Sequence, residues 1–439
     1  MGRESLVEAV RRAGVVGSGG AGFPAHVKLQ AKGIDTYLVN GAECEPLLEG
    51  DRALMASRAP ELVSAAETVA EALGAKPVFA LKEKYREAAE ALAKAGATVA
   101  ASRDYYPLGD EVILIWETLG RIVPEGSLPL DVGVVVNNVE TVLNIHGALQ
   151  GRPVTHTFVS SGGAVASPGL FRAPLGASAR EVIEASGGVT IPDPVYVDGG
   201  PMMGRYADDP DFPVTKTTKA ILVLPRDSLL ARMEQMPVKT MLKQARVSCC
   251  QCNQCTLACS RYLVGIGIEP HRIMRTMAFE ETRNREVLQM ALLCSECNLC
   301  SALHACPMGL SPRRVNQQIK KLFREEGIRP SFPQRALSVH PLRDYRLLPS
   351  SRLKARLGLD KYDVEVPYRG ELEVTEVTIL LKQHAGAAAA TLVASGDVVA
   401  EGDCIAAPPE GALGARIHAS LGGVVKSVDG QRIVLSRQG

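Results

Sequence analysis

Nine of the eleven cysteines in this 439-residue chain lie between positions 249 and 306, in two runs with a repeated spacing. The first run consists of Cys249, Cys252, Cys255 and Cys259, and the second of Cys294, Cys297, Cys300 and Cys306. In each run three thiols recur at every third position, so one short loop can bring them to the same centre. A [4Fe–4S] cluster is held by four thiolates, three from such a loop and one from elsewhere. The spacing therefore predicts two [4Fe–4S] clusters.

The fourth cysteine of each run determines how the clusters are connected. In proteins with two such clusters, the distant cysteine of each run binds the other cluster. One cluster is then held by Cys249, Cys252, Cys255 and Cys306, and the other by Cys294, Cys297, Cys300 and Cys259. Ser260 stands where proline usually follows, and five residues rather than the usual three precede Cys306. Neither departure removes a ligand. Cys250 is an additional thiol beside a ligand, and an exchange with Cys249 stays open.

Zinc and disulfide bonds are the alternatives for so many cysteines. A zinc ribbon uses two separated CxxC pairs and does not need a third cysteine three positions further on. Disulfide frameworks are typical of small secreted domains. This chain is long, and its first residues, MGRESLVEAVRRAG, have the pattern of an amphipathic helix and lack a signal-peptide apolar stretch. Zinc or structural thiols remain the weaker alternatives.

The composition excludes several classes of function. With 49 basic and 48 acidic residues the net charge is near zero, so nothing indicates binding to nucleic acid or to an anionic membrane. Aromatic residues make up only 4%, which argues against a platform for stacked bases. No apolar run approaches the roughly 20 residues that span a bilayer. Cysteines gathered for metal binding fit a reducing compartment. We expect a cytosolic protein, or one enclosed within a cytosolic compartment.

A glycine-rich stretch follows a helix expected over residues 5–13. It reads Gly17-Ser18-Gly19-Gly20-Ala21-Gly22-Phe23-Pro24. Glycines leave backbone N–H groups uncovered and permit positive φ, which suits a loop around a phosphate. Lys28, a few residues further on, can add a positive charge. The glycines alone leave a flexible turn open as the alternative.

The first 150 residues alternate between expected strands and helices. Strands are expected over 36–39, 77–81 and 132–136, and helices over 60–73 and 83–95, which predicts a parallel α/β sheet. Ligands of such sheets bind beyond the carboxyl ends of the strands. Polar residues gather at two of these ends, namely Asn40, Glu43 and Glu45 after the first strand and Asn137, Asn138 and Thr141 after the last. Side-chain amides there can read a flavin's ring edge, while hydroxyl and backbone groups take its ribityl chain and phosphate.

Together, the glycine-rich stretch with Lys28, residues 40–46 and residues 137–141 resemble the signature of the flavin-binding subunit of respiratory complex I. They resemble the RnfC- and PduS-type relatives of that family more closely. The resemblance implies that these elements bind FMN non-covalently and that the glycine-rich loop also faces NADH. The segment Tyr106-Pro107-Leu108-Gly109-Asp110-Glu111 matches a family segment at the same flavin and nicotinamide pocket.

The resemblance also implies roles for single residues. Glu45 and Glu111 are the acidic residues near the nucleotide, and Phe23 stacks on the adenine or the ring system. Complex I relatives carry an aromatic pair just after the lysine, where this chain has Leu29 and Gln30. The absence of this aromatic pair is expected to affect NADH affinity more than FMN binding. No residue is assigned to acid–base catalysis, because electron transfer needs only short gaps between cofactors.

The fold class that follows is multidomain α/β. We expect a Rossmann-like FMN/NADH-binding domain at 1–150, a β-grasp domain of the soluble-ligand-binding (SLBB) type at 151–230 and an α-helical two-cluster ferredoxin-like domain at 235–330. A linker at 331–370 leads to a C-terminal all-β barrel-sandwich domain of the biotinyl/lipoyl type at 371–439. The last domain has no lysine at a hairpin tip for a swinging arm, so we expect a docking module. Its C-terminal position matches the PduS-type order, whereas RnfC carries a similar module at its N-terminus.

Local patterns give further elements within these domains. In the second domain we expect a strand over 154–159, a turn-rich segment over 161–169 and a helix over 179–186 capped by Ser178. Helices over 270–279 and 284–293 are expected between the two cysteine runs. The basic stretch 320–329 is expected to form a solvated helix face.

These cofactors together predict a converter of electron pairs into single electrons. A hydride donor delivers two electrons at once and a cluster takes one, while a flavin can accept the pair and release single electrons. We therefore expect an oxidoreductase that passes electrons from NADH through FMN and two [4Fe–4S] clusters to a one-electron acceptor. The PduS-type resemblance implies that the acceptor is cobalamin, in propanediol utilisation. It further implies a corrinoid-handling adenosyltransferase and microcompartment shell proteins as partners, and a place in the cytoplasm inside a bacterial microcompartment.

Two alternatives stay open. The first is an RnfC-like electron-input subunit of a membrane ion-translocating ferredoxin:NAD oxidoreductase. The second is a non-enzymatic electron-transfer scaffold that has no NADH step of its own.

Overall fold

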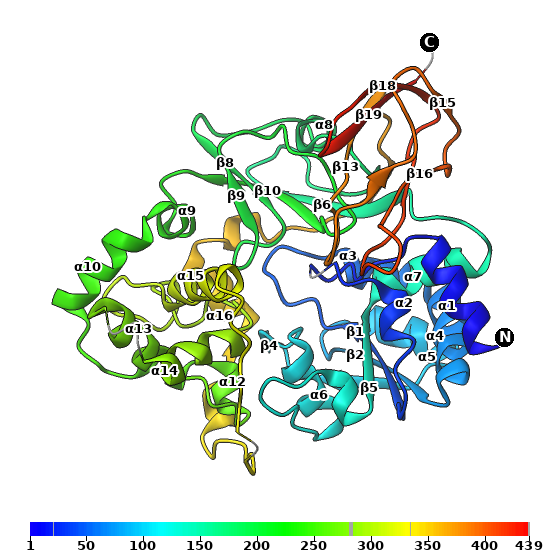
Figure 1. The fold of residues 1–439 in the computed structure, drawn as a ribbon. Helices are drawn as coiled ribbons and strands as arrows, with labels where there is room; N and C mark the ends of the chain where they lie inside the picture. Colours follow the sequence, from blue (N-terminus) through cyan, green and yellow to red (C-terminus); the bar gives the residue numbers. More distant parts are fainter. Residues whose placement is uncertain (21, 281–283, 334, 438–439) are drawn as a thin grey trace.

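The computed structural model describes residues 1–20, 22–280, 284–333 and 335–437 (Figure 1). Ala21, which the sequence analysis assigns to cofactor binding, lies outside the described residues. In Figure 1 the N-terminal α/β part and the helical part that carries the cysteines lie side by side, and two β-rich parts lie above them. Within the described ranges, no helix combines the length and the apolar character needed to cross a membrane.

The N-terminal part contains a four-stranded parallel sheet in the order β3-β2-β1-β5. Its strands are β1 (Thr36–Gly41), β2 (Lys76–Lys82), β3 (Val99–Ser102) and β5 (Val134–Asn138). The three expected strands are confirmed with shifted ends. In particular, β5 begins at Val134 rather than at 132 and runs through Asn137 and Asn138. The parallel register places Asn40 beside Asn138, so the two polar clusters meet at one edge of the sheet.

Helices cover both faces of this sheet. One face is covered by α1 (Arg3–Arg12), α3 (Gly50–Ser57), α4 (Ala59–Leu73), α5 (Arg86–Lys94) and α7 (Val139–Leu149), and the other by α6 (Glu111–Leu119). A short helix, α2 (Ala25–Lys28), follows the glycine-rich stretch. Successive side chains of a strand point to opposite faces. Tyr37 and Val39 of β1 therefore pack in one core, and Leu38 packs in the other.

The second part is a mixed six-stranded sheet in the order β12-β7-β6-β10-β8-β9. Its strands are β6 (His156–Gly163), β7 (Leu170–Pro174), β8 (Pro194–Asp198), β9 (Arg205–Ala207), β10 (Ala220–Pro225) and β12 (Tyr368–Glu371). The expectation of turns from 161 onward is wrong for residues 161–163, because these residues pair with β10 and prolong β6. The expected cap is confirmed: Ser178 and Glu181 form a capping box at the start of α8 (Ala179–Ala185).

The cysteine-bearing part is helical. It contains α9 (Leu229–Gln235), α10 (Val238–Ser248), α11 (Gln254–Leu257), α12 (Ser260–Leu263), α13 (Pro270–Ala278), α14 (Arg285–Gln289) and α15 (Pro312–Glu325). The helix expected over 284–293 is divided, since α14 is followed by a 3-10 turn, η2 (Met290–Leu293). Met241, Ile273 and Val315 share one core with Leu38 of β1 and Leu222 of β10. The cysteines are therefore held by helices that pack directly on the other two parts.

The C-terminal part consists of short strands. β13 (Glu376–Leu380), β19 (Arg432–Ser436), β18 (Gly423–Val428) and β15 (Val398–Val399) form an antiparallel sheet, and β14 (Ala390–Thr391), β16 (Cys404–Ala407) and β17 (Ile417–His418) form another. The segment 331–370, expected to be a linker, contributes β12 to the six-stranded sheet. It also contains α16 (Ser350–Leu357) and β11 (Leu348–Pro349), which pairs with β4 (Tyr105–Tyr106).

Candidate functional site: a flavin-type pocket beside two cysteine groups

The glycine-rich stretch is closed by its own backbone. The Gly17 N–H donates to the Phe23 carbonyl at 2.8 Å, and the Gly22 N–H donates to the Gly17 carbonyl at 3.2 Å. Phe23 itself is half-buried. Gly20 has φ +101°, in the region that favours glycine. A Cβ atom on Gly20 would meet nothing within 4 Å, whereas one on Gly22 would lie 3.1 Å from the Cα of His384. The loop is thus open at Gly20 and covered by the C-terminal part at Gly22.

This loop lies over the carboxyl end of β5 and the start of α7. The Ser18 N–H donates to Thr141 Oγ1 at 2.9 Å, and a Cβ atom on Gly19 would lie 3.6 Å from the Cβ of Asn138. The Ser18 hydroxyl is buried, and no hydrogen-bond partner is found for it in the described part of the chain. An unpaired buried hydroxyl costs about 1–3 kcal/mol. An open glycine turn with a free buried hydroxyl therefore fits the oxygen-rich ribityl and phosphate groups of FMN.

The remaining predicted polar residues surround the same edge of the sheet. Asn40, which lies inside β1 rather than after it, donates from Nδ2 to the Gly109 carbonyl at 2.9 Å, and this bond joins the end of β1 to the segment before α6. Asn137 Nδ2 donates to the Tyr37 hydroxyl at 3.0 Å inside the sheet. Lys28 Nζ lies 3.0 Å from Glu111 Oε1 and 3.0 Å from the Val136 carbonyl. The charge of Lys28 is thus balanced by Glu111 beside the carboxyl end of β5.

A buried ion network that sequence reasoning missed lies next to these residues. Lys219, the residue before β10, lies 2.8 Å from Asp51 Oδ1 and 2.7 Å from Glu140 Oε2. Asp51 also accepts from Asn138 Nδ2 at 2.5 Å, and its N–H donates to Glu43 at 3.0 Å. Burial, followed by the charge of Asp51, raises the pKa of Glu43 to about 8. The only sequence signal was a lysine placed directly before an apolar strand.

Glu45, predicted to lie near the nucleotide, reaches a junction of three parts. Its carboxylate accepts from the Met202 N–H at 2.9 Å and lies 3.2 Å from the Tyr106 hydroxyl. Burial raises the pKa of Glu45 to about 7. The Tyr106 hydroxyl in turn donates to the Cys297 carbonyl at 2.8 Å. These contacts join the end of β1, the loop after β8 and the second cysteine run.

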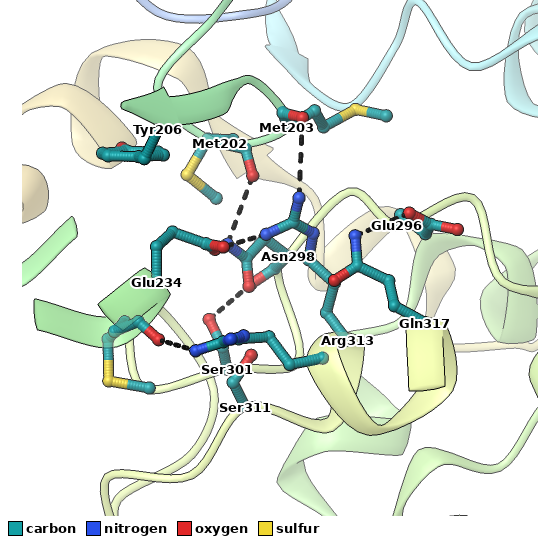
Figure 2. Close-up of polar contacts among 12 residues, drawn as sticks. Met202, Met203, Tyr206, Glu234, Glu296, Asn298, Ser301, Ser311, Arg313 and Gln317 are labelled. Atoms are coloured by element: carbon teal, nitrogen blue, oxygen red, sulfur yellow. Dashed lines mark hydrogen bonds and ion pairs between the residues drawn. The ribbon is translucent and has the colours of Figure 1, made fainter. Parts of the chain in front are cut away.

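Figure 2 shows the other side of this junction. Asn298 Nδ2 donates to the Met202 carbonyl at 3.2 Å, and Arg313 lies between the carboxylate of Glu234 and the Met203 carbonyl. Asn298 and Arg313 are only 2% and 3% exposed. The loop that carries Met202 is therefore anchored on the second cysteine run by buried polar groups.

Asp110 makes a second direct connection between the α/β part and the cysteines. It caps α6 by accepting from the Val112 N–H at 2.9 Å. Its two carboxylate oxygens also accept from Arg261, at 3.0 Å from Nε and 3.2 Å from Nη2. Although burial acts in the opposite direction, Arg261 lowers the pKa of Asp110. No local sequence pattern indicates this role of Arg261, because Asp110 lies 151 positions away in the chain.

One group of thiols lines a cavity. Cys249, Cys252, Cys255 and Cys306 line it together with Cys250, and His271, Met274 and Pro307 are among the other lining residues. Burial and the neighbouring Cys306, Cys249 and Cys252 raise the pKa of Cys255 to about 12. Cys250 and Cys252 are exposed to solvent. The structure thus brings Cys306 of the second run to the first run.

The other group is more enclosed. Burial and neighbouring thiols raise the pKa of Cys297, Cys300 and Cys259, and Cys294 is a neighbour of all three. Burial and mutual repulsion oppose four bare thiolates, whereas bound iron would compensate their charge, so the donor set fits a cluster. In the described residues no three potential ligands lie close enough to hold one metal ion.

Both cysteine loops have the same backbone form. The residues on either side of the middle cysteine have positive φ in each run, with values of 54° and 59° for Gln251 and Asn253 and of 64° and 69° for Glu296 and Asn298. Non-glycine residues seldom adopt this region, and it costs free energy there. Its repetition at equivalent positions indicates that both loops are shaped for the same kind of group.

Four known domain families match along the chain. The Nuo51 FMN-binding domain matches residues 10–147, the SLBB domain 161–206, the 4Fe-4S dicluster domain 248–311 and the RnfC barrel sandwich hybrid domain 370–438. The chain is therefore a multidomain α/β flavin and iron–sulfur protein, with FMN and 4Fe-4S clusters as cofactors.

Relatives narrow the class further. The chain is 46% identical over 440 residues to cobalamin reductase PduS of Salmonella typhimurium, an alignment that covers 99% of this chain and 97% of the relative. It is 43% identical over 443 residues to cobalamin reductase PduS of Citrobacter freundii, with the same coverage of 99% and 97%. The chain belongs to the PduS family. A component of the Na(+)-translocating ferredoxin:NAD(+) oxidoreductase complex of Acetobacterium woodii is 33% identical over 279 residues, which cover 61% of this chain and 60% of that component.

Proposed function

We propose that this chain is an NADH-dependent cobalamin reductase. Its relatives named cobalamin reductase support cobalamin as the acceptor, and the FMN-binding and dicluster domains support the route. When bound, FMN links a donor of electron pairs to clusters that carry one electron each. One NADH leaves NAD⁺ and a proton and supplies two electrons, so each of two cobalt centres gains one electron. The residues of the chain bind and orient these groups and keep water from the gaps between them.

The FMN pocket lies at the carboxyl ends of β1 and β5 in this proposal. Gly17, Ser18, Gly19 and Gly20 would hold the phosphate and ribityl groups together with Thr141. Asn40 and Asn138 would face the ring edge. The free Ser18 hydroxyl and the open Gly20 turn support this assignment. Lys28 and Glu111 would meet the nicotinamide nucleotide.

The hydrogen bond from Tyr106 to the Cys297 carbonyl is the observation that supports the order in which electrons would pass through the two clusters. Cys259, Cys294, Cys297 and Cys300 would hold the cluster that receives electrons from the flavin, because this group lies directly against the flavin-type domain. Cys249, Cys252, Cys255 and Cys306 would hold the cluster that passes electrons to the acceptor, because Cys252 of this group is exposed to solvent. An exit at the surface suits an acceptor that arrives from solution.

Anaerobically purified chain tests the proposal. We expect about eight irons, about eight sulfides and one FMN per chain. NADH alone should bleach the flavin, and cobalamin should then reoxidise it while its own spectrum changes. A zinc-containing protein without flavin contradicts the proposal. Reduction by dithionite but not by NADH would favour the electron-transfer scaffold instead, and copurification with integral membrane proteins would favour the RnfC-like role.

The finer architecture and the setting are part of the same proposal. The domain limits are 1–150, 151–230, 235–330 and 371–439, and the connection 331–370 ends in β12, which joins the sheet of the second domain. The second domain is a β-grasp fold and the last an all-β barrel-sandwich fold, which the sheet orders support. The protein acts in the cytoplasm inside a bacterial microcompartment, beside a corrinoid-handling adenosyltransferase and shell proteins. Affinity purification from cells that form such compartments tests these partners.

A further inference from the structure

Arg261 is a largely buried cation between the flavin-type domain and the more enclosed cysteine group. It follows Cys259 by two positions, and its Nη1 donates to the carbonyl of Leu293, the residue before Cys294, at 2.9 Å. Its Nε and Nη2 reach the two oxygens of Asp110 at 3.0 and 3.2 Å. The guanidinium is therefore held on one side by the backbone carbonyl that precedes Cys294 and on the other side by a carboxylate of the other domain.

We propose that Arg261 raises the reduction potential of the cluster held by Cys259, Cys294, Cys297 and Cys300, and that Asp110 limits this increase. The inference rests on the proposed function, since it requires a cluster at these thiols. Reduction adds a negative charge to the cluster, so a nearby cation stabilises the reduced form and a nearby anion destabilises it. Both residues would change the reduction potential of the cluster through their charge and would not bind the iron themselves.

The surroundings favour a strong effect from this pair. The Asp110 side chain is 6% exposed, and its oxygens are taken by Arg261 and by the cap of α6. Screening by solvent is weak at such a site. Lys320 is another cation near this group: it donates to the Cys294 carbonyl at 2.6 Å and pairs with Glu296 at 2.7 Å. Its carboxylate partner is 29% exposed, so removing Lys320 should change the potential less.

The opposite signs of the two charges give a sharp test. In Arg261→Met the ratio of reduced to oxidised cluster at a fixed potential should fall about tenfold, which is about 59 mV for a one-electron couple. In Asp110→Asn, which keeps the size of the side chain and an oxygen for the cap, the ratio should rise. The double variant should return close to the unmodified chain. Arg261→Lys keeps the charge and should shift the ratio less than about threefold.

The measurement is an anaerobic redox titration followed by electron paramagnetic resonance on the full-length holoprotein. Iron and sulfide contents are determined for every variant. The cluster of Cys249, Cys252, Cys255 and Cys306 is an internal reference whose potential should stay constant. Arg180→Met serves as the matched control, since Arg180 pairs with Asp211 on the exposed side of α8.

Each outcome separates this inference from the proposed function. If both clusters are present but Arg261→Met and Asp110→Asn leave the potentials unchanged, or shift them in the same direction, the inference is wrong. If Arg261→Met fails to assemble the cluster, Asp110→Asn decides alone, and a potential that does not rise overturns the inference. A wild-type chain without clusters overturns the proposed function instead.

Discussion

The hydroxyl of Tyr106 donates to the backbone carbonyl of Cys297 across 2.8 Å, although the two residues are 191 positions apart in the chain. Tyr106 is fully buried, and the same hydroxyl lies 3.2 Å from Glu45. Tyr106 thus connects the flavin-type domain directly to the more enclosed cysteine group, in addition to the contact between Asp110 and Arg261.

Replacement of this tyrosine should weaken the contact between the domains. Tyr106→Phe leaves the Cys297 carbonyl without a donor in a buried site, which costs about 1–3 kcal/mol. We expect the midpoint of thermal unfolding to fall and cobalamin reduction by NADH to slow, with the flavin content unchanged. Tyr345→Phe is the control, because Tyr345 is 86% exposed. Equal stability of both variants would contradict the role of this hydrogen bond.

Ser18 allows a test of the flavin pocket that separates binding from folding. Because its hydroxyl is buried without a partner among the described residues, Ser18→Ala should leave the stability of the flavin-free chain unchanged or slightly higher. FMN affinity should fall about 5–10-fold, the equivalent of roughly 1 kcal/mol. Equilibrium titration of flavin-free protein with FMN, followed by fluorescence quenching, measures this change. Unaltered affinity would remove Ser18 from the pocket.

The network around Lys219 should contribute strongly to stability. Lys219→Met leaves Asp51 and Glu140 buried without their cation, and breaking a buried pair in this way costs about 3–5 kcal/mol. Urea unfolding should show this loss. The double variant Lys219→Met with Glu140→Gln should recover part of it, because one uncompensated charge is removed. If the double variant is no more stable than the single one, the carboxylate of Glu140 is not what Lys219 compensates.

A second buried lysine predicts a pH dependence. Lys216 is 2% exposed, donates to the Gly14 carbonyl at 2.7 Å and the Arg416 carbonyl at 2.6 Å, and burial lowers its pKa from 10.5 to about 7. The unfolded chain holds this proton up to a higher pH than the folded chain, so stability should rise between about pH 7 and pH 10.5. The penalty is complete below pH 7 and amounts to at most about 5 kcal/mol.

The measurement for Lys216 is chemical unfolding at a series of pH values. Lys216→Met should remove the rise between pH 7 and 10.5 seen in the unmodified chain, whereas the exposed Lys382→Met should keep it. A slope that survives in Lys216→Met must come from another group.

The two cysteine groups predict distinct losses of iron. Cys255→Ser should reduce the iron content from about eight to about four per chain by removing the cluster of the cavity that Cys255 lines. Cys300→Ser should remove the other cluster to the same extent. Cys250→Ser should retain both, since Cys250 is an additional thiol on the cavity wall. Loss of iron in Cys250→Ser would mean that Cys250, and not Cys249, is the cluster ligand.

Local sequence patterns predicted the parts of this protein that depend on neighbouring residues. The spacing of Cys249, Cys252 and Cys255 reports a loop shaped around one centre, and the alternation of strands and helices reports a parallel sheet. The cap at Ser178 also follows from residues within one turn of a helix. Such features need only short-range backbone geometry, which a stretch of sequence specifies by itself.

The tertiary structure decided which distant groups meet. Arg261 binds Asp110, and Glu45 accepts a hydrogen bond from Met202. Lys219 binds Asp51 and Glu140. These contacts join residues up to 168 positions apart in the chain. No periodicity encodes these pairs, because they form only when separate domains bury one shared core. Burial then requires each charge to find a partner, and this requirement links the flavin-type pocket to the cysteines.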